Sequence, residues 1–231
     1  MKLNTNSNTY IIIYSTIMVV IVAFLLAFVS QTLKPLQDAN VALDTEKQIL
    51  NSLNLRGLSD EEAHATFEKI VAFDEAQNVY VCTLENGDVK YVLPLKGQGM
   101  WGGISCFLAI DSDKNTVYGA YFNHESETAG LGAEIKDSQK WQEKFIGKKV
   151  FVDPADGSEV ALAVVKNVDD PTTQVDCVTG ATLTSNGVND MIKAGLKDAG
   201  KRFVQLFVNM QCCKDEPVDS TTVEEPKAEE E

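Results

Sequence analysis

A run of uncharged, apolar residues near the start of the chain constrains its fold and location more than any other feature. Tyr10–Val29 holds twenty residues without a charge, and only Ser15 and Thr16 among them are strongly polar. At about 1.5 Å of rise per residue, a helix of this length spans the roughly 30 Å of a bilayer's hydrocarbon. We therefore predict a single-pass anchor that places residues 10–29 in a lipid bilayer.

A cleaved signal peptide is the alternative to an anchor. Its apolar region is usually roughly 7 to 15 residues long, which is shorter than this run, and no Ala-x-Ala cleavage pattern follows here. The flanking charges predict no orientation, because Lys2 lies on one side of the run while Lys34 and Lys47 lie on the other.

The rest of the chain carries the patterns of one α+β domain with helical and acidic extensions. Short apolar or alternating runs predict strands over 79–84, 89–95, 104–110, 117–122 and 160–168, paired as antiparallel hairpins in the first four cases. Helices are predicted over 33–55, 59–70 and 137–145, and a long amphipathic helix closes the domain. The expected organisation is an anchor over 1–32, a helical stalk and a second helix over 33–71, the folded domain over 72–213, and an acidic tail over 214–231.

Three local signals support these elements. Asn86-Gly87 suits a two-residue hairpin turn, because both positions of such a turn need positive φ angles. Ser59 and Glu62 have the spacing of a capping box that begins a helix. The final helix is predicted from apolar residues at helical spacing, namely Val188, Met191, Ile192, Leu196, Ala199, Phe203, Leu206 and Phe207.

The charge of the chain excludes a class of partners. A net charge of −14 repels nucleic acid, so none is expected as a partner. The tail from Lys214 to Glu231 carries eight acidic residues and two lysines, and it has too few apolar residues to offset the entropy of ordering, so we predict that it is disordered. The five cysteines form no Cys-x-x-Cys pair, and neither a metal site nor a disulfide framework is expected.

The stretch from Asp176 to Ser185 has the chemistry of a phosphate site. Thr184 or Ser185 has the residue type of a helix N-cap, which would place residues 179–182 in the turn that enters the last helix. Unpaired N–H groups and the positive end of the helix dipole favour an anion there. Spacing alone also fits a simple capped turn, in which Thr182 would have no special role.

This stretch resembles a flavinylation motif, Asp-x-x-(Ser/Thr)-Gly-Ala-(Thr/Ser). In proteins with that motif, a flavin transferase joins FMN through a phosphoester bond to the last hydroxyl. The resemblance implies that Thr182 is the attachment site. It also implies that Asp176, Thr179, Gly180 and Ala181 are recognition residues.

Two further segments resemble FMN-binding subunits. His124–Gly132 is similar to a His-x-x-Glu-Thr-Pro-Gly-Leu-Gly element, with Ala129 in place of the proline, and Glu127 and Thr128 are then candidates for contact with the ring or ribityl chain. Gly97–Gly103 is similar to a Gly-x-Gly-Leu-Trp region, where Trp101 either stacks near the flavin or, as we expect, packs in the core or a loop. The candidate cofactor-binding residues are Glu127, Thr128, Leu131, Asp176, Thr179, Gly180, Ala181, Thr182 and Thr184.

Together the segments resemble the C subunit of the sodium-translocating NADH:quinone oxidoreductase. The resemblance implies that residues 72–213 form an FMN-binding domain, with FMN attached covalently to Thr182, that relays electrons between membrane subunits and takes part in sodium export. A flavin transferase would act during maturation, and the soluble domain would face the periplasm from the inner membrane. No dinucleotide-binding glycine pattern follows a strand, so we expect no separate NADH site.

Two alternatives stay open from the sequence. The same attachment motif occurs in the G subunit of the Rnf electron-transport complex, which would place the chain in a ferredoxin-linked assembly. The chain also fits a noncatalytic, membrane-tethered assembly module, in which the loop before the last helix is only a capped turn.

Overall fold

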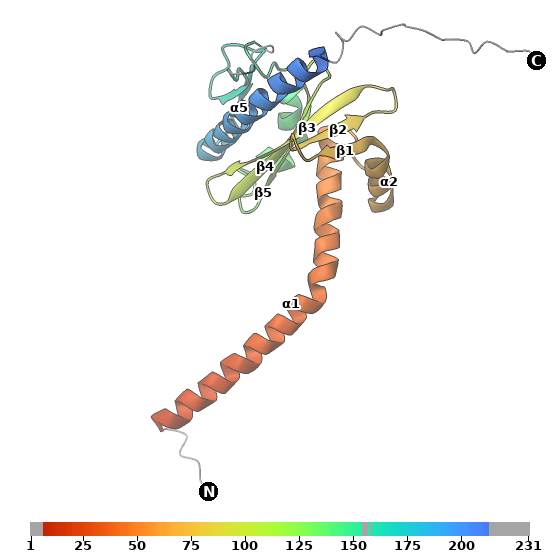
Figure 1. The fold of residues 1–231 in the computed structure, drawn as a ribbon. Coiled ribbons are helices and arrows are strands. Elements are labelled where there is room, and N and C mark those ends of the chain that lie inside the picture. Colours follow the sequence, from red (N-terminus) through yellow and green to blue (C-terminus); the bar gives the residue numbers. More distant parts are fainter. Residues whose placement is uncertain (1–6, 154–156, 158, 213–231) are drawn as a thin grey trace, which may run out of the picture. The chain divides into compact units, whose positions relative to one another are not determined.

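The computed structural model describes residues 7–153, 157 and 159–212, with side chains as far as Lys201. The chain divides into two units, Met1–Ile70 and Val71–Glu231 (Figure 1). The predicted acidic tail over 214–231 lies outside the described residues, as do the side chains of Phe203, Leu206 and Phe207. The division of the first unit into an anchor and a stalk stays a prediction.

The first unit is built on one long helix, α1, which spans Asn8–Ser52. The hydroxyl of Ser7 caps it by accepting from the Tyr10 N–H at 3.2 Å. We expected separate helices before and after residue 33, but the helix continues through Pro35, where a missing N–H and a ring clash bend a helix without always ending it. Figure 1 shows such a bend along α1. By length and composition this helix is able to cross a membrane; large apolar side chains between Ile11 and Val41 are exposed, whereas Ile49 and Leu50 near its end are buried.

A second helix, α2, spans Asp60–Ile70 and begins with the predicted capping box. The Glu62 carboxylate accepts from the Ser59 N–H at 3.0 Å, and the Ser59 hydroxyl accepts from the Glu62 N–H at 3.3 Å. Polar contacts join α2 to the end of α1: Lys47 pairs with Asp60, and the His64 ring lies 2.9 Å from Glu46.

The second unit contains a five-stranded antiparallel sheet in which each strand pairs with the next along the chain. Its strands are β1 (Val71–Asp74), β2 (Val79–Thr83), β3 (Val89–Gln98), β4 (Gly103–Ile110) and β5 (Val117–His124). The two predicted hairpins are therefore confirmed. The sequence pattern missed β1, because four residues directly after a helix are too few to show an alternating pattern.

The turn between β2 and β3 differs from the two-residue turn that we predicted. Only Gly87 has a positive φ, of 84°, and its N–H donates to the Leu84 carbonyl at 2.9 Å. The Leu84 N–H in turn donates to the carbonyl of Asp88 at 2.9 Å. The loop therefore has one more residue than predicted, and the glycine alone takes the left-handed conformation.

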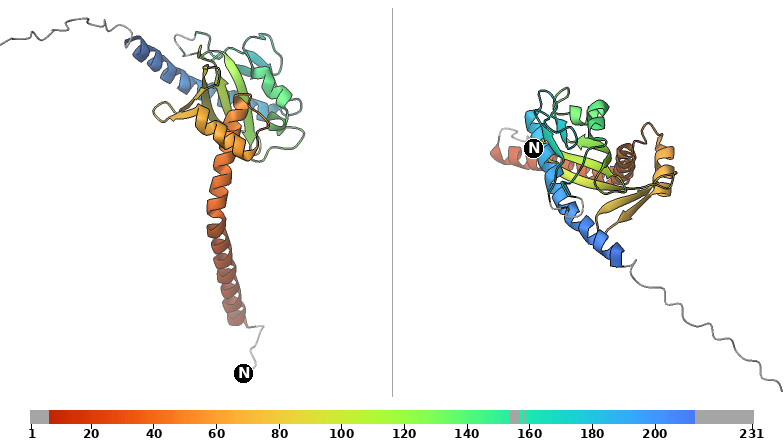
Figure 2. Two further views of the ribbon diagram at one scale, coloured as in Figure 1. Left: turned by 90° about the vertical axis from the view of Figure 1, so that its right-hand side faces the viewer. Right: turned by 90° about the horizontal axis from the view of Figure 1, so that it is seen from above.

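The long helix α5 (Thr182–Cys212) covers one face of the sheet and packs on β3 (Figures 1 and 2). Its predicted apolar face is confirmed as far as the side chains are described, because Val188, Met191, Ile192, Leu196 and Ala199 are all buried in the core. Glycines allow the close approach. A Cβ on Gly97 would lie 2.6 Å from Met191 Cβ, and a Cβ on Gly187 would lie 2.3 Å from the backbone oxygen of Gln98.

Short elements flank the sheet at β5. In place of the single helix predicted over 137–145, the chain forms α3 (Glu134–Asp137), α4 (Gln139–Gln142) and the 3-10 turn η1 (Glu143–Phe145). The break comes at Ser138, because its hydroxyl accepts from the Trp141 N–H and so begins α4 as a new helix. Trp141 and Phe145 pack on Phe122 of β5 with ring centroids 5.2 and 5.0 Å away. The strand predicted over 160–168 is reduced to β6 (Ala163–Val165), which pairs in parallel with β7 (Gln174–Asp176).

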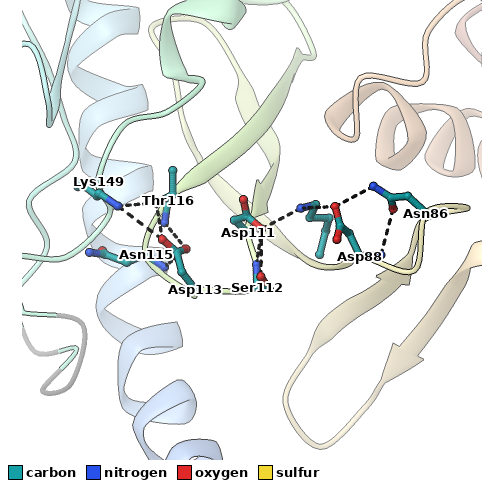
Figure 3. A network of polar contacts seen from close by, with 9 residues as sticks. Asn86, Asp88, Asp111, Ser112, Asp113, Asn115, Thr116 and Lys149 are labelled. Atoms are coloured by element: carbon teal, nitrogen blue, oxygen red, sulfur yellow. Dashed lines mark hydrogen bonds and ion pairs between the residues drawn. The ribbon is translucent and has the colours of Figure 1, made fainter.

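Most acidic residues in the hairpin loops stabilise the loops themselves (Figure 3). Asp113 accepts from the N–H groups of Asn115 and Thr116 at 2.9 and 2.8 Å. Asp111 accepts from the buried Lys90 ammonium at 2.8 Å, and this ion pair lowers the pKa of the Asp111 carboxyl. Within the described ranges, no group of three or more His, Cys, Asp or Glu residues is placed to hold a metal ion.

The contact between α5 and β3 yields a stability prediction. Gly187→Ala gains about 1 kcal/mol of helix propensity but forces a methyl group against a backbone oxygen, and overpacking costs about 1 to 3 kcal/mol even where side chains give way. We expect the free energy of unfolding to fall, measured by urea denaturation of the full chain in detergent. Lys193→Ala, at an exposed position of the same helix, is the control and should change it by about 0.5 kcal/mol or less. Equal stability of Gly187→Ala and wild type would contradict the close contact between Gly187 and the backbone oxygen of Gln98.

Candidate functional site

The predicted phosphate turn leads directly into α5, but the helix begins earlier than expected. Its first backbone bond runs from the Ser185 N–H to the Ala181 carbonyl at 2.9 Å, so Thr182 is already helical. The prediction that Thr184 or Ser185 is the N-cap is therefore wrong. Both hydroxyls have other partners: Ser185 accepts from the Val178 N–H at 3.1 Å, and Thr184 donates to a carboxylate outside the helix.

Thr182 lies at the open end of this helix. Its side chain is exposed, as are Thr179 and Gly180, whereas Ala181 is buried beneath them. The N–H groups of Thr182, Leu183 and Thr184 precede the first helical bond, and the positive end of the helix dipole lies at the same place. Gly180 has a φ of 80°, a conformation that other residues adopt at a cost. An accessible hydroxyl thus lies where a phosphate is favoured.

Asp176 lies beside a polar cavity before this turn. Its carboxylate accepts from Lys144 Nζ at 2.7 and 2.9 Å, and its backbone carbonyl accepts from the Trp141 indole N–H at 2.8 Å. The cavity has a volume of about 400 Å³. It is lined by Gly130, Glu134, Ser138, Lys140, Trp141, Lys144, Asp176, Cys177, Val178 and Thr179. Two of the motif residues, Asp176 and Thr179, therefore share one cavity with Gly130 of the second segment.

Glu127 joins the other two predicted segments to α5. One carboxylate oxygen accepts from the Trp101 N–H at 2.9 Å, and the other accepts from the Thr184 hydroxyl at 2.7 Å. Its own N–H donates to His124 Nδ1 at 3.2 Å. The side chain is 8% exposed. Burial alone would raise the pKa of Glu127, but the hydrogen bonds from Trp101 and Thr184 outweigh it and the pKa is lowered.

The glycines of these segments make room for side-chain oxygens. A Cβ on Gly99 would lie 2.4 Å from one Glu127 carboxylate oxygen, and a Cβ on Gly132 would lie 2.4 Å from the other. A Cβ on Gly102 would lie 2.2 Å from the Ser126 hydroxyl oxygen. The turn between β3 and β4 is closed by the Gly99 N–H, which donates to the Gly102 carbonyl at 2.9 Å. Gly99 and Gly132 are thus required by close packing around the Glu127 carboxylate, and Gly102 by close packing against the Ser126 hydroxyl.

Apolar side chains are exposed around this turn and around the start of α5. Trp101 is 63% exposed, so of the two expected roles, packing in the core or in a loop, the core role is wrong. Met100, Leu131 and Leu183 are also exposed, and Leu131 Cδ2 lies 2.9 Å from where a Gly180 Cβ would be. Water-exposed side chains of this size suit the apolar face of a planar ligand.

The structure brings predicted residues together in two places: Asp176 and Thr179 line one cavity, and Glu127, Leu131 and Thr184 lie at the start of α5. Glu127 and Thr184 are in direct contact, and Leu131 lies over the turn before Thr182. Thr128 is exposed, and its backbone carbonyl accepts from the N–H groups of Leu131 and Ala133 at 3.1 and 3.0 Å. Lys144 was not predicted as a site residue, because a single lysine in a short helix carries no signal of its partner. Leu183 was also not predicted, because its only unusual property is its exposure.

The site lies within a match to a known family model. Residues 99–197 match the FMN-binding domain, a range that contains every candidate residue. The C subunit of the Na(+)-translocating NADH-quinone reductase of Haemophilus ducreyi is 30% identical over 237 residues, covering 83% of this chain and 91% of the relative. This chain belongs to that C-subunit family.

Two further relatives agree with this assignment. The C subunit of the same reductase from Pseudomonas aeruginosa is 28% identical over 82% of this chain and 91% of its own length. A crystal structure of the corresponding protein from Parabacteroides distasonis superposes with a TM-score of 0.64 at 32% identity, covering 74% of this chain and 96% of that one. The expected resemblance and the expected α+β fold, with an amino-terminal apolar helix, an antiparallel sheet and a carboxy-terminal helix, are therefore confirmed.

The lowered pKa of Glu127 yields a prediction about acid stability. A carboxyl whose pKa is lower in the folded state stabilises the fold above its unfolded pKa, and that contribution disappears as the pH falls through the folded pKa. We expect the free energy of unfolding to decrease from about pH 4.5, the ordinary value, downward. Glu127→Gln should flatten this decrease when denaturation is followed by circular dichroism at several pH values. If the free energy of unfolding fell just as steeply with pH in Glu127→Gln as in wild type, this result would contradict the lowered pKa of Glu127.

Proposed function

We propose that this chain is a membrane-anchored flavoprotein that carries FMN as a phosphoester on Thr182 and relays electrons within a sodium-translocating NADH:quinone reductase. The observation that carries the proposal is the exposed Thr182 hydroxyl at the start of α5, in a matching attachment motif and within an FMN-binding domain.

The residues present fit an attached FMN. The N–H groups at the start of α5 suit its phosphate, and Gly180 leaves the backbone of the turn accessible. Leu131, Leu183 and Trp101 offer exposed apolar surface for the ring. Bound there, the flavin supplies the capacity to accept and release electrons, while the chain supplies its position and its electrostatic surroundings.

A covalent bond would change what the rest of the site has to do. Free association costs about 4 to 15 kcal/mol in lost translational and rotational freedom, and a tethered cofactor avoids that cost in its binding to the site. Weak contacts are then sufficient to orient the ring. One edge of the ring is then free to face a partner, as electron transfer between neighbouring subunits requires.

The proposal includes the partners and the location that the resemblance implies. The relatives are named as subunits of a reductase that acts on NADH and quinone and translocates sodium, and we extend that assembly to this chain. We place α1 in the inner membrane, the folded domain in the periplasm, and the NADH site on another protein of the complex. A flavin transferase would modify Thr182 after folding has formed the turn.

Substitution of Thr182 tests the attachment. With the flavin transferase co-expressed, the wild-type chain should gain the mass of one FMN less one water and give a fluorescent band after denaturing electrophoresis. Thr182→Ala should give neither, because no hydroxyl remains to form the ester. Thr182→Ser is the matched control and should still be modified, since the motif admits either hydroxyl.

Peptide mapping identifies the modified residue in the same samples. A wild-type chain without added mass would sink the proposal and leave the loop as a capped turn. Co-purification of a modified chain with ferredoxin-linked subunits would move it to an Rnf-type complex.

Charge placed in α1 tests the anchor. Arginine at the centre of a membrane helix costs about 2.5 to 3.5 kcal/mol on insertion scales, so Val20→Arg with Phe24→Arg should shift the chain from the membrane pellet to the supernatant on alkaline extraction. Val41→Arg is the control, because it is equally exposed in the same helix but lies beyond residues 10–29. Retention of the double variant in the membrane would argue against the span.

A further inference from the structure

Glu127 lies where three separate segments of the domain meet. Its two carboxylate oxygens bind different elements, the turn that carries Trp101 and the first turn of α5 that carries Thr182. The contact distances are 2.9 Å to the Trp101 N–H and 2.7 Å to the Thr184 hydroxyl. One buried side chain therefore links the backbone at Trp101 to the helical turn that carries the proposed attachment site.

We propose that Glu127 is a positioning residue that fixes the turn carrying Trp101 against the first turn of α5 and places a negative charge near the ligand carried by Thr182. This inference rests on the proposed function, because it assigns a role within the same site. It assigns Glu127 a role different from the direct flavin contact that the sequence suggested.

Direct contact with the cofactor is disfavoured by the direction of the side chain. Both oxygens are directed at protein groups, and 8% of the residue is exposed. The absence of a Cβ at Gly99 and Gly132 makes room for these same oxygens, so the packing is built around the carboxylate. Trp101, by contrast, is 63% exposed and available to a ligand.

A carboxylate suits this role better than an amide. It accepts hydrogen bonds at both oxygens, and besides Trp101 and Thr184 the N–H groups of Met100 and Gly102 also favour its ionised form. An amide offers one acceptor oxygen, so its N–H donors would face either the backbone donors, which they would repel, or the Thr184 hydroxyl, which would then have to accept instead of donate. The Glu127 backbone is itself fixed by its bond to His124 Nδ1.

The charge has a predictable consequence for electron transfer. A buried negative charge close to a redox group opposes the uptake of electrons, and low dielectric surroundings strengthen the effect. Glu127 would thus keep the midpoint potential of the attached flavin lower than a neutral residue would. A merely structural contact would not shift this potential in a fixed direction.

Glu127→Gln is the test, with Glu125→Gln as the matched control. Glu125 is an exposed carboxylate two residues away that accepts from the Gly103 N–H at 3.1 Å, so it holds the same turn without reaching α5. Full chains are produced with and without the flavin transferase. Four quantities are measured: added mass, flavin midpoint potential, flavin fluorescence, and amide hydrogen exchange in residues 99–102.

We expect Glu127→Gln to carry flavin, to show a more positive midpoint potential, and to exchange its turn amides about tenfold faster or more. Flavin fluorescence should also rise, because a mobile Trp101 quenches it less, and Trp101→Phe identifies that contribution. Glu125→Gln should match wild type in potential. Wild-type potential and exchange in Glu127→Gln would overturn the inference.

A second variant covers the case in which Glu127→Gln does not fold. Thr184→Val removes one of the two bonds and retains the charge, so it should speed exchange in residues 99–102 with a smaller change in potential. Exchange is also measured on chains made without the transferase. Failure of flavin attachment in wild type would therefore defeat the proposed function while the exchange data still decide whether Glu127 fixes the turn.

Discussion

The close approach of α5 to β3 is the contact on which the site depends. Gly187 lies against the backbone oxygen of Gln98, and Gly97 lies against Met191, so neither element is able to shift without a clash or a void. Thr182 begins the same helix that carries Gly187 and Met191. Its position relative to the sheet is therefore set by core packing several residues away, and the loop before it has only to reach the helix.

Local electrostatics at the site run against the charge of the whole chain. A net charge of −14 opposes a phosphate, yet the start of α5 presents a positive dipole end within one turn of Thr182. Asp176 is paired with Lys144, whose ammonium offsets its charge, whereas the Glu127 carboxylate accepts only from neutral backbone and hydroxyl donors. The helix end therefore favours an anion, while Glu127 remains a negative charge close to it.

The sequence predicted the parts of this molecule that local patterns control. The capping box at Ser59, the hairpins from β2 to β5 and the buried face of α5 follow from periodicity and side-chain chemistry within a short window. What it missed depends on distant partners. Thr184 and Ser185 look like N-caps in isolation, but Glu127 and the Val178 N–H bind their hydroxyls, and only the folded chain brings these groups together.

The exposure of Trp101 was also not evident from the sequence, and this exposure affects how the proposed site would function. We expected Trp101 to pack in the core or in a loop, because large aromatic side chains are usually buried, yet the residue is 63% exposed while Glu127 binds its backbone N–H. A deep pocket would hold a free cofactor but would also shield it from a partner. Under the proposed function, an ester at Thr182 would remove the need for burial, so a few exposed apolar side chains would be sufficient to orient the ring and would leave an edge open for electron transfer.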